Sequence, residues 1–268
     1  MICLSQGDLP DHAQALLQKY QQEIDGLSDY PSRVSAAKVT FARHNTARRE
    51  PFKTVRATLT SLCCGAQRCM YCEDSCADEV EHFKPKDLYP EVCFVWENYL
   101  YSCGRCNRPK NNKFAVFASG TLLPIEVARG RNAPIVPPFS GDPVLINPRV
   151  ENPLDFLEID LATGVISARG RKNSRNFRRA EYTIKLLRLN DRPELLQTRQ
   201  NGYRSYLARL EQYVQRKATG VSSAALDRLS QAIQRMEHRS VWNEMQRQAQ
   251  RMGELRAIFD LAPEAKLW

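Results

Sequence analysis

The chain has 268 residues, of which 43% are hydrophobic and 26% charged, with a formal net charge of +9, and this composition is ordinary for a globular protein. No apolar run approaches the roughly 18 residues that span a bilayer, and the first ten residues lack the pattern of a signal peptide. We therefore expect a cytoplasmic protein. Its nine cysteines indicate metal ligands or buried thiols rather than a disulfide framework.

The first 64 residues are predicted to be helical. Three helices are expected, over residues 11–25, 32–45 and 51–64. Apolar side chains recur at helical spacing in each of them. Asp11 and Ser32 are possible N-caps of the first two helices, and Gly65 is a plausible end of the third.

Two CxxC pairs follow, separated by thirty residues. They are Cys69 with Cys72 and Cys103 with Cys106. Two such pairs can place four thiolates around one ion, which predicts a tetrahedral structural zinc site. Buried free thiols are the alternative reading, and Cys76 or Cys93 could replace one of the four ligands. A four-cysteine zinc site has no open position, so the chemistry is expected in or just beyond the loop between the pairs.

That loop contains Glu81 and His82 side by side, and Asn107 follows the last cysteine. On a strand, neighbouring side chains point to opposite faces. The carboxylate of Glu81 and the amide oxygen of Asn107 suit Mg²⁺ or Mn²⁺, and a neutral His82 can take a proton from water near pH 7. These groups together predict metal-assisted hydrolysis of a phosphodiester.

The second half of the chain is expected to begin with a Pro-rich linker over 133–143 and a β-hairpin over 156–168. From about residue 174 the chain looks helical, with a long helix starting near Pro193, another carrying Leu226 to Met236, and one more formed by the last twenty-five residues.

Positive charge is concentrated in residues 165–220, which hold fourteen Lys or Arg and four Asp or Glu. Such a segment indicates a nucleic-acid-binding surface, and a solvated helical face is the alternative. The candidate phosphate contacts are Lys84, Lys86, Arg105, Lys110, Arg175, Arg178 and Arg179.

The predicted fold class is α+β and mostly helical. The expected regions are an N-terminal helical segment (1–64), a zinc-stapled ββα module (65–132), a linker with a hairpin (133–170) and a basic C-terminal helical region (171–268).

The segments CMYCE, EVEHFKPK and WENYLYSCGRCNRPK resemble the HNH (ββα-metal) endonucleases that carry a four-cysteine zinc knuckle, over about residues 69–113. The resemblance implies that His82 is the general base and that Glu81 and Asn107 bind the catalytic divalent ion. It implies that Asn98 is the central asparagine, which fixes the loop and orients the histidine. Many members have Asp and His where this chain has Glu81 and Asn107.

A wider resemblance, carried by FKTVRATL, VEHFKPKDLYPE and LINPRVENPLDFLEID, is to HNH proteins of bacterial anti-phage systems, namely the PtuB component of Septu and retron-associated HNH effectors. It implies a nuclease that acts on nucleic acid, with DNA favoured, together with an ABC-type ATPase partner of the PtuA kind. The alternatives are the same nuclease acting on RNA such as tRNA, and a non-catalytic zinc-ribbon protein that binds nucleic acid or a partner.

Overall fold

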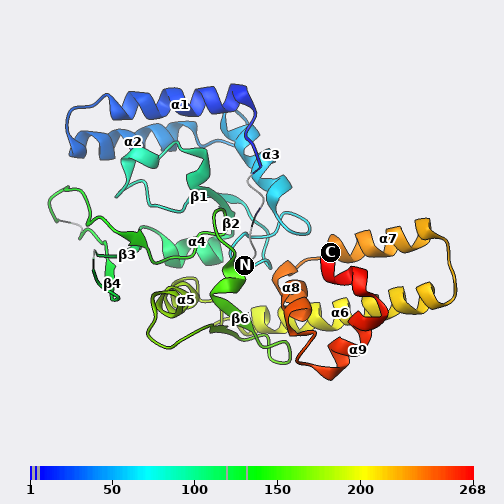
Figure 1. The fold of residues 1–268 in the computed structure, drawn as a ribbon. Helices are drawn as coiled ribbons and strands as arrows, with labels where there is room; N and C mark the ends of the chain where they lie inside the picture. Colours follow the sequence, from blue (N-terminus) through cyan, green and yellow to red (C-terminus); the bar gives the residue numbers. More distant parts are fainter. Residues whose placement is uncertain (2–3, 5–6, 119, 131) are drawn as a thin grey trace.

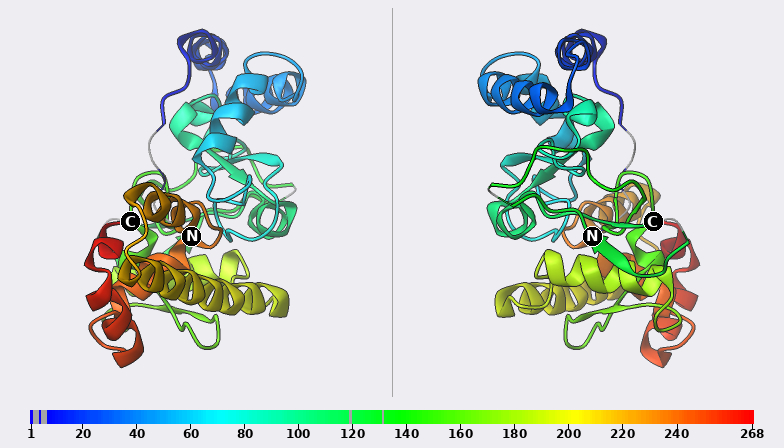
Figure 2. Two further views of the ribbon diagram at one scale, coloured as in Figure 1. Left: turned by 90° about the vertical axis from the view of Figure 1, so that its right-hand side faces the viewer. Right: turned by 90° about the vertical axis from the view of Figure 1, so that its left-hand side faces the viewer.

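The computed structural model describes residues 1, 4, 7–118, 120–130 and 132–268. Helices form its two ends, with the N-terminal helices at one end and the C-terminal helices at the other, and small β-sheets and helix α4 lie between them (Figures 1 and 2). This mostly helical α+β architecture confirms the predicted fold class. Among the described residues, no helix is both long enough and apolar enough to cross a membrane.

The N-terminal end consists of α1 (Asp11–Asp25), α2 (Tyr30–His44) and α3 (Phe52–Leu62). The three predicted helices are present, but two of the expected caps and one expected end are wrong. Helix α2 begins earlier because Asp29 caps it, accepting a hydrogen bond of 2.9 Å from the backbone N–H of Ser32. Asp11 is the first residue of α1 and follows Pro10 at the N-cap. Helix α3 ends before Gly65.

The centre of the molecule is a ββα unit. Strand β1 (Glu79–His82) pairs antiparallel with β2 (Tyr99–Ser102), so that His82 lies opposite Tyr99, and α4 (Gly104–Lys110) follows β2 directly. All four residues of β2 are buried. The loop between the strands contains two short 3-10 helices, η1 (Pro90–Val92) and η2 (Trp96–Asn98).

A second small sheet follows, which was not predicted from the sequence. Its strands are β3 (Ala115–Phe117), β4 (Pro124–Glu126) and β5 (Asp142–Pro143), in the order β4-β3-β5. The last residues of the predicted linker thus form an edge strand. The hairpin expected over 156–168 is present as β6 (Leu157–Ile159) and β7 (Ile166–Ala168), preceded by the 3-10 helix η3 (Pro153–Asp155).

The C-terminal end is helical, as predicted. Its elements are α5 (Arg175–Leu186), α6 (Pro193–Ala218), α7 (Ser223–Gln234), α8 (Arg239–Gln248), α9 (Gly253–Leu261) and the 3-10 helix η4 (Pro263–Leu267). The single helix expected over the last twenty-five residues is wrong, because the chain turns between α8 and α9. The turn lets Phe259 and Trp268 pack on the buried ring of Trp242, with ring centroids 5.6 and 6.2 Å away.

Candidate active site and metal centre

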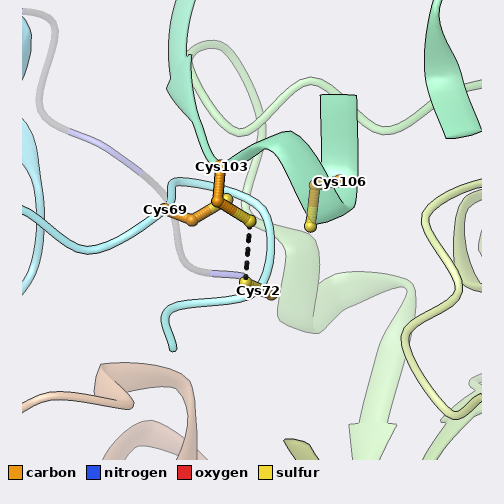
Figure 3. Close-up of side chains that lie close together, drawn as sticks. All are labelled: Cys69, Cys72, Cys103 and Cys106. Carbon is orange, nitrogen blue, oxygen red and sulfur yellow. Dashed lines mark hydrogen bonds between the residues drawn. The ribbon is translucent and has the colours of Figure 1, made fainter. Parts of the chain in front are cut away.

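Four cysteine side chains meet between the loop after α3 and helix α4 (Figure 3). They are the predicted set: Cys69, Cys72, Cys103 and Cys106. Their sulfur atoms lie within 4.8 Å of one another and all four residues are buried, and the sulfurs of Cys72 and Cys103 are 3.9 Å apart. Zinc–sulfur bonds of about 2.3 Å in a tetrahedron place the sulfurs about 3.8 Å apart. The cluster can therefore hold a metal ion such as zinc.

Backbone hydrogen bonds shape both halves of this sulfur cluster. The N–H of Glu73 donates to the carbonyl of Cys69 at 2.8 Å and closes a turn around the first pair. The carbonyl of Cys103, at the N-terminus of α4, accepts from the N–H groups of Cys106 and Asn107 at 3.0 and 2.9 Å. Each CxxC segment thus turns two thiols toward one point.

The two cysteines that could have replaced a ligand lie elsewhere. Cys76 is exposed, and Cys93 is buried against α2, where its thiol donates to the carbonyl of Ala37 at 3.7 Å.

The sulfur cluster has one neighbour from the C-terminal end of the fold. Arg192, the N-cap residue of α6, donates to the sulfur of Cys106 at 3.5 Å. Burial raises the pKa of Cys69, so the thiols need a compensating cation before all can ionise.

A cleft of about 610 Å³ lies beside the ββα unit. One part of its lining carries acidic, amide and imidazole groups from β1 and α4, namely Glu79, Glu81, His82 and Asn107. Positively charged side chains also line it, namely Arg56, Lys86 and Arg108. The structure therefore brings three of the four predicted catalytic residues, His82, Glu81 and Asn107, to one cleft.

His82 ends strand β1, and its ring packs against Phe41 and Tyr99, with ring centroids 4.4 and 5.2 Å away. Its Nε2 lies 2.9 Å from the carbonyl oxygen of Cys93. Because a carbonyl only accepts, Nε2 carries the proton and Nδ1 is the basic nitrogen. Burial, together with the positive charge of Lys86, lowers the pKa of His82 to about 3. The imidazole is therefore neutral at neutral pH.

Glu81 is held inside the module by two partners. Its carboxylate pairs with the ammonium of Lys110 and accepts a hydrogen bond of 2.8 Å from the hydroxyl of Tyr71. Lys110, the last residue of α4, is fully buried and also donates to the backbone carbonyl of His82 at 2.8 Å. Burial raises the pKa of Glu81, and the charge of Lys110 opposes that rise. This buried network ties β1 to α4.

Asn107 contacts Glu79 rather than Glu81. Its Nδ2 donates to Oε2 of Glu79 at 2.5 Å. Glu79 and Glu81 are two residues apart on β1, a spacing that places both on one face of the strand. Glu79 was not predicted as a site residue, although the alternation in Glu79-Val80-Glu81-His82 was the available signal. Carboxylate and amide oxygens suit Mg²⁺, which commonly takes one or two carboxylates and completes its shell with water and phosphate. Glu79 and Asn107 therefore fit a hard divalent ion.

Asn98 fixes the loop between the two strands. Its side chain accepts from the backbone N–H of Lys84 at 2.8 Å and donates to the carbonyls of Lys84 and Val92 at 3.0 and 2.9 Å. It makes no hydrogen bond to the His82 ring, which is oriented instead by the carbonyl of Cys93.

The residues expected to contact phosphate in the ββα module lie in different places. Lys86 lines the cleft, whereas Lys84 lies over the ring of Tyr89 and lines other hollows. Lys110 is buried in the network described above, so its ammonium could reach bound phosphate only if that network opened. Arg105 lies on the exposed side of α4 and pairs with Glu194.

The arginines of α5 make internal contacts. Arg175 pairs with Asp142 at 2.9 Å, and Arg179 is half-buried and donates to Glu151 at 2.8 Å. Arg178 donates through Nε to the carbonyl of Asn173 at 3.2 Å. None of the three lines the cleft beside the ββα unit.

Comparison with known proteins finds two similar Septu proteins. The Septu protein PtuB of Bacillus mycoides (strain KBAB4) is 31% identical over 178 residues, which are 59% of this chain and 55% of the relative. The Septu protein PtuB of Bacillus thuringiensis is 50% identical over 48 residues, which are 16% of this chain and 19% of the relative. The chain thus spans about half the length of the first relative and about a fifth of the second. No family model matches the chain.

Proposed function

We propose that this protein is a metal-dependent endonuclease that hydrolyses phosphodiester bonds of nucleic acid, as its resemblance to HNH enzymes implies. The observation that carries the proposal is one cleft shared by the neutral imidazole of His82 and the oxygen ligands of Glu79 and Asn107. A general base and a site for a hard cation beside the same phosphate are what this hydrolysis requires.

In this mechanism Nδ1 of His82 accepts the proton of the attacking water. The hydrogen bond from Nε2 to the carbonyl of Cys93 holds the ring in the required tautomer and stabilises the charge that the ring gains. Lys86 and Arg108 offset the charge of the bound phosphates. A divalent ion held by Glu79 and Asn107 would supply positive charge to the leaving oxygen. Glu81, the ligand that the resemblance implies, would have to release Lys110 to join them.

We favour DNA as the substrate. RNA such as tRNA in a retron-type system is the alternative, because a site that binds the phosphate backbone does not itself distinguish ribose from deoxyribose. Both similar proteins are named Septu protein PtuB. On that basis we place the chain in a Septu-type anti-phage defence system, with an ABC-type ATPase of the PtuA kind as its partner. Zinc in the sulfur cluster would stabilise the module without taking part in the reaction.

The test is cleavage of plasmid DNA and of labelled RNA with Mg²⁺ or Mn²⁺, by the wild type and by His82→Ala, Glu79→Gln and Glu81→Gln. Loss of a catalytic base costs about 100-fold or more in rate. We expect His82→Ala and Glu79→Gln to lose cleavage while keeping zinc and fold. The matched control is His12→Ala, since His12 is an exposed histidine on α1, and it should cleave normally.

Equal cleavage by wild type and His82→Ala would remove His82 from the mechanism. If Glu81→Gln loses cleavage at unchanged stability while Glu79→Gln does not, Glu81 is the ligand. A wild type that binds nucleic acid but cleaves none with either metal would favour the non-catalytic zinc-ribbon reading.

A further inference from the structure

One wall of the cleft comes from outside the ββα unit. Asn45, the residue after α2, and Arg56, in α3, line the same cleft as His82 and Asn107. Both residues belong to the N-terminal end of the fold, which Figure 1 shows packed beside β1 and β2. Neither was anticipated from the sequence, because nothing in a helical pattern indicates that one arginine faces a distant strand.

The guanidinium of Arg56 is held in place by neutral acceptors. Nη2 donates to Oδ1 of Asn45 at 2.7 Å, and Nη1 donates to the backbone carbonyl of Asp78 at 3.0 Å. The first acceptor directly follows α2, and the second directly precedes β1. The group is therefore fixed between the helices and the strand that carries Glu79.

Two features leave this guanidinium ready for an anion. No carboxylate of the described residues lies within 4 Å of it, whereas Arg105, Arg175 and Arg179 each have an acidic partner. Its two hydrogen bonds use one N–H of each Nη group, so the second N–H on each Nη can donate to an anion in the cleft.

We propose that Arg56, held by Asn45, binds a phosphate of the nucleic-acid backbone next to the phosphodiester that is cut, so that α2 and α3 form the second half of the substrate site. The planar guanidinium matches phosphate oxygens in a fork geometry that an ammonium cannot reproduce. Arg108, which lines the cleft from α4, adds positive charge to the same cleft. This inference rests on the proposed function and deepens it.

The experiment measures binding, because binding separates this role from catalysis. In a His82→Ala background, which keeps the substrate intact, the affinity for a short fluorescent DNA is measured by anisotropy over a series of salt concentrations. We expect Arg56→Ala to bind about ten-fold more weakly. The slope of log affinity against log salt should fall by about one, as for the loss of one phosphate contact.

Two further variants make the result specific. Arg56→Lys keeps the charge and should restore the salt slope but only part of the affinity. Lys53→Ala removes a positive charge from an exposed position of the same helix that does not line the cleft, and it should leave both quantities unchanged. The melting temperature of each variant shows that the fold is intact.

The inference is overturned if Arg56→Ala keeps the salt slope of its parent, even when its affinity falls, since a purely structural residue would behave in that way. A parent that binds neither DNA nor the RNA of the same sequence would instead overturn the proposed function itself. The two failures therefore give different results.

Discussion

The buried pair of Lys110 and Glu81 supports a quantitative prediction for Lys110→Met. The Lys110 side chain is fully buried and that of Glu81 is 3% exposed, so water cannot replace a missing ammonium. The substitution leaves a carboxylate without a cation, and it also leaves the carbonyl of His82 without its donor. Breaking a buried pair in this way costs about 3–5 kcal/mol. That is a large part of the roughly 5–15 kcal/mol that stabilises a typical domain.

The assay is unfolding by guanidinium chloride with zinc held constant, in a double-mutant cycle. Adding Glu81→Gln to Lys110→Met should recover about 2 kcal/mol or more, because the amide is neutral and can still accept from Tyr71. Lys113→Met removes an exposed lysine three residues further on and should change the stability by less than about 0.5 kcal/mol. A loss below about 1 kcal/mol for Lys110→Met, or no recovery in the double variant, would refute the reasoning.

Two further predictions concern the metal centre and the histidine. Cys103→Ser should reduce bound zinc from about one ion per chain and destabilise the module by on the order of 10 kcal/mol. Atomic emission measures the zinc, and circular dichroism measures the stability. Cys76→Ser should retain zinc, and the opposite result for the two variants would mean a different ligand set. The pKa of His82 is lowered from 6.5 to about 3. Between these two values the ring is protonated in the unfolded chain and neutral in the folded chain. Stability should therefore fall as the pH drops from about 6.5 toward 3, by about 1.4 kcal/mol per pH unit between 6 and 4. His82→Gln should lack this part of the acid sensitivity, and equal pH profiles would contradict the assigned cause.

The elements that the sequence predicted well are those with a strong local pattern. Helices α1 and α6 carry apolar residues at helical spacing, and the hairpin of β6 and β7 alternates around a turn that contains Gly164. The strands β3 to β5 are only two or three residues long, which is too short for a periodic signal. The turn between α8 and α9 depends on packing around Trp242, a tertiary contact that no local pattern encodes.

The residues of the candidate site also differ in how far a local pattern predicts them. The spacing of the four cysteines predicts that they meet, and the structure brings together the four that were expected. The partners of Glu81, Glu79 and Arg56 could not be predicted, since each depends on how β1 packs against α4 or α3. The spacing within β1 shows that Glu79 and Glu81 share a face. Only the fold shows that Lys110 pairs with Glu81 and that Asn107 contacts Glu79.

The contact of Phe41 with the ring of His82 means that the pKa of this histidine is not set by its own sequence motif alone. Phe41 belongs to α2, and burial is the main cause of the depressed basicity of the imidazole. A minimal fragment cut at the borders of the motif would expose the ring to solvent and return its proton affinity toward that of a free side chain. Transplanting the motif onto another scaffold would therefore carry the imidazole without its depressed pKa, unless an aromatic residue is rebuilt in the place of Phe41.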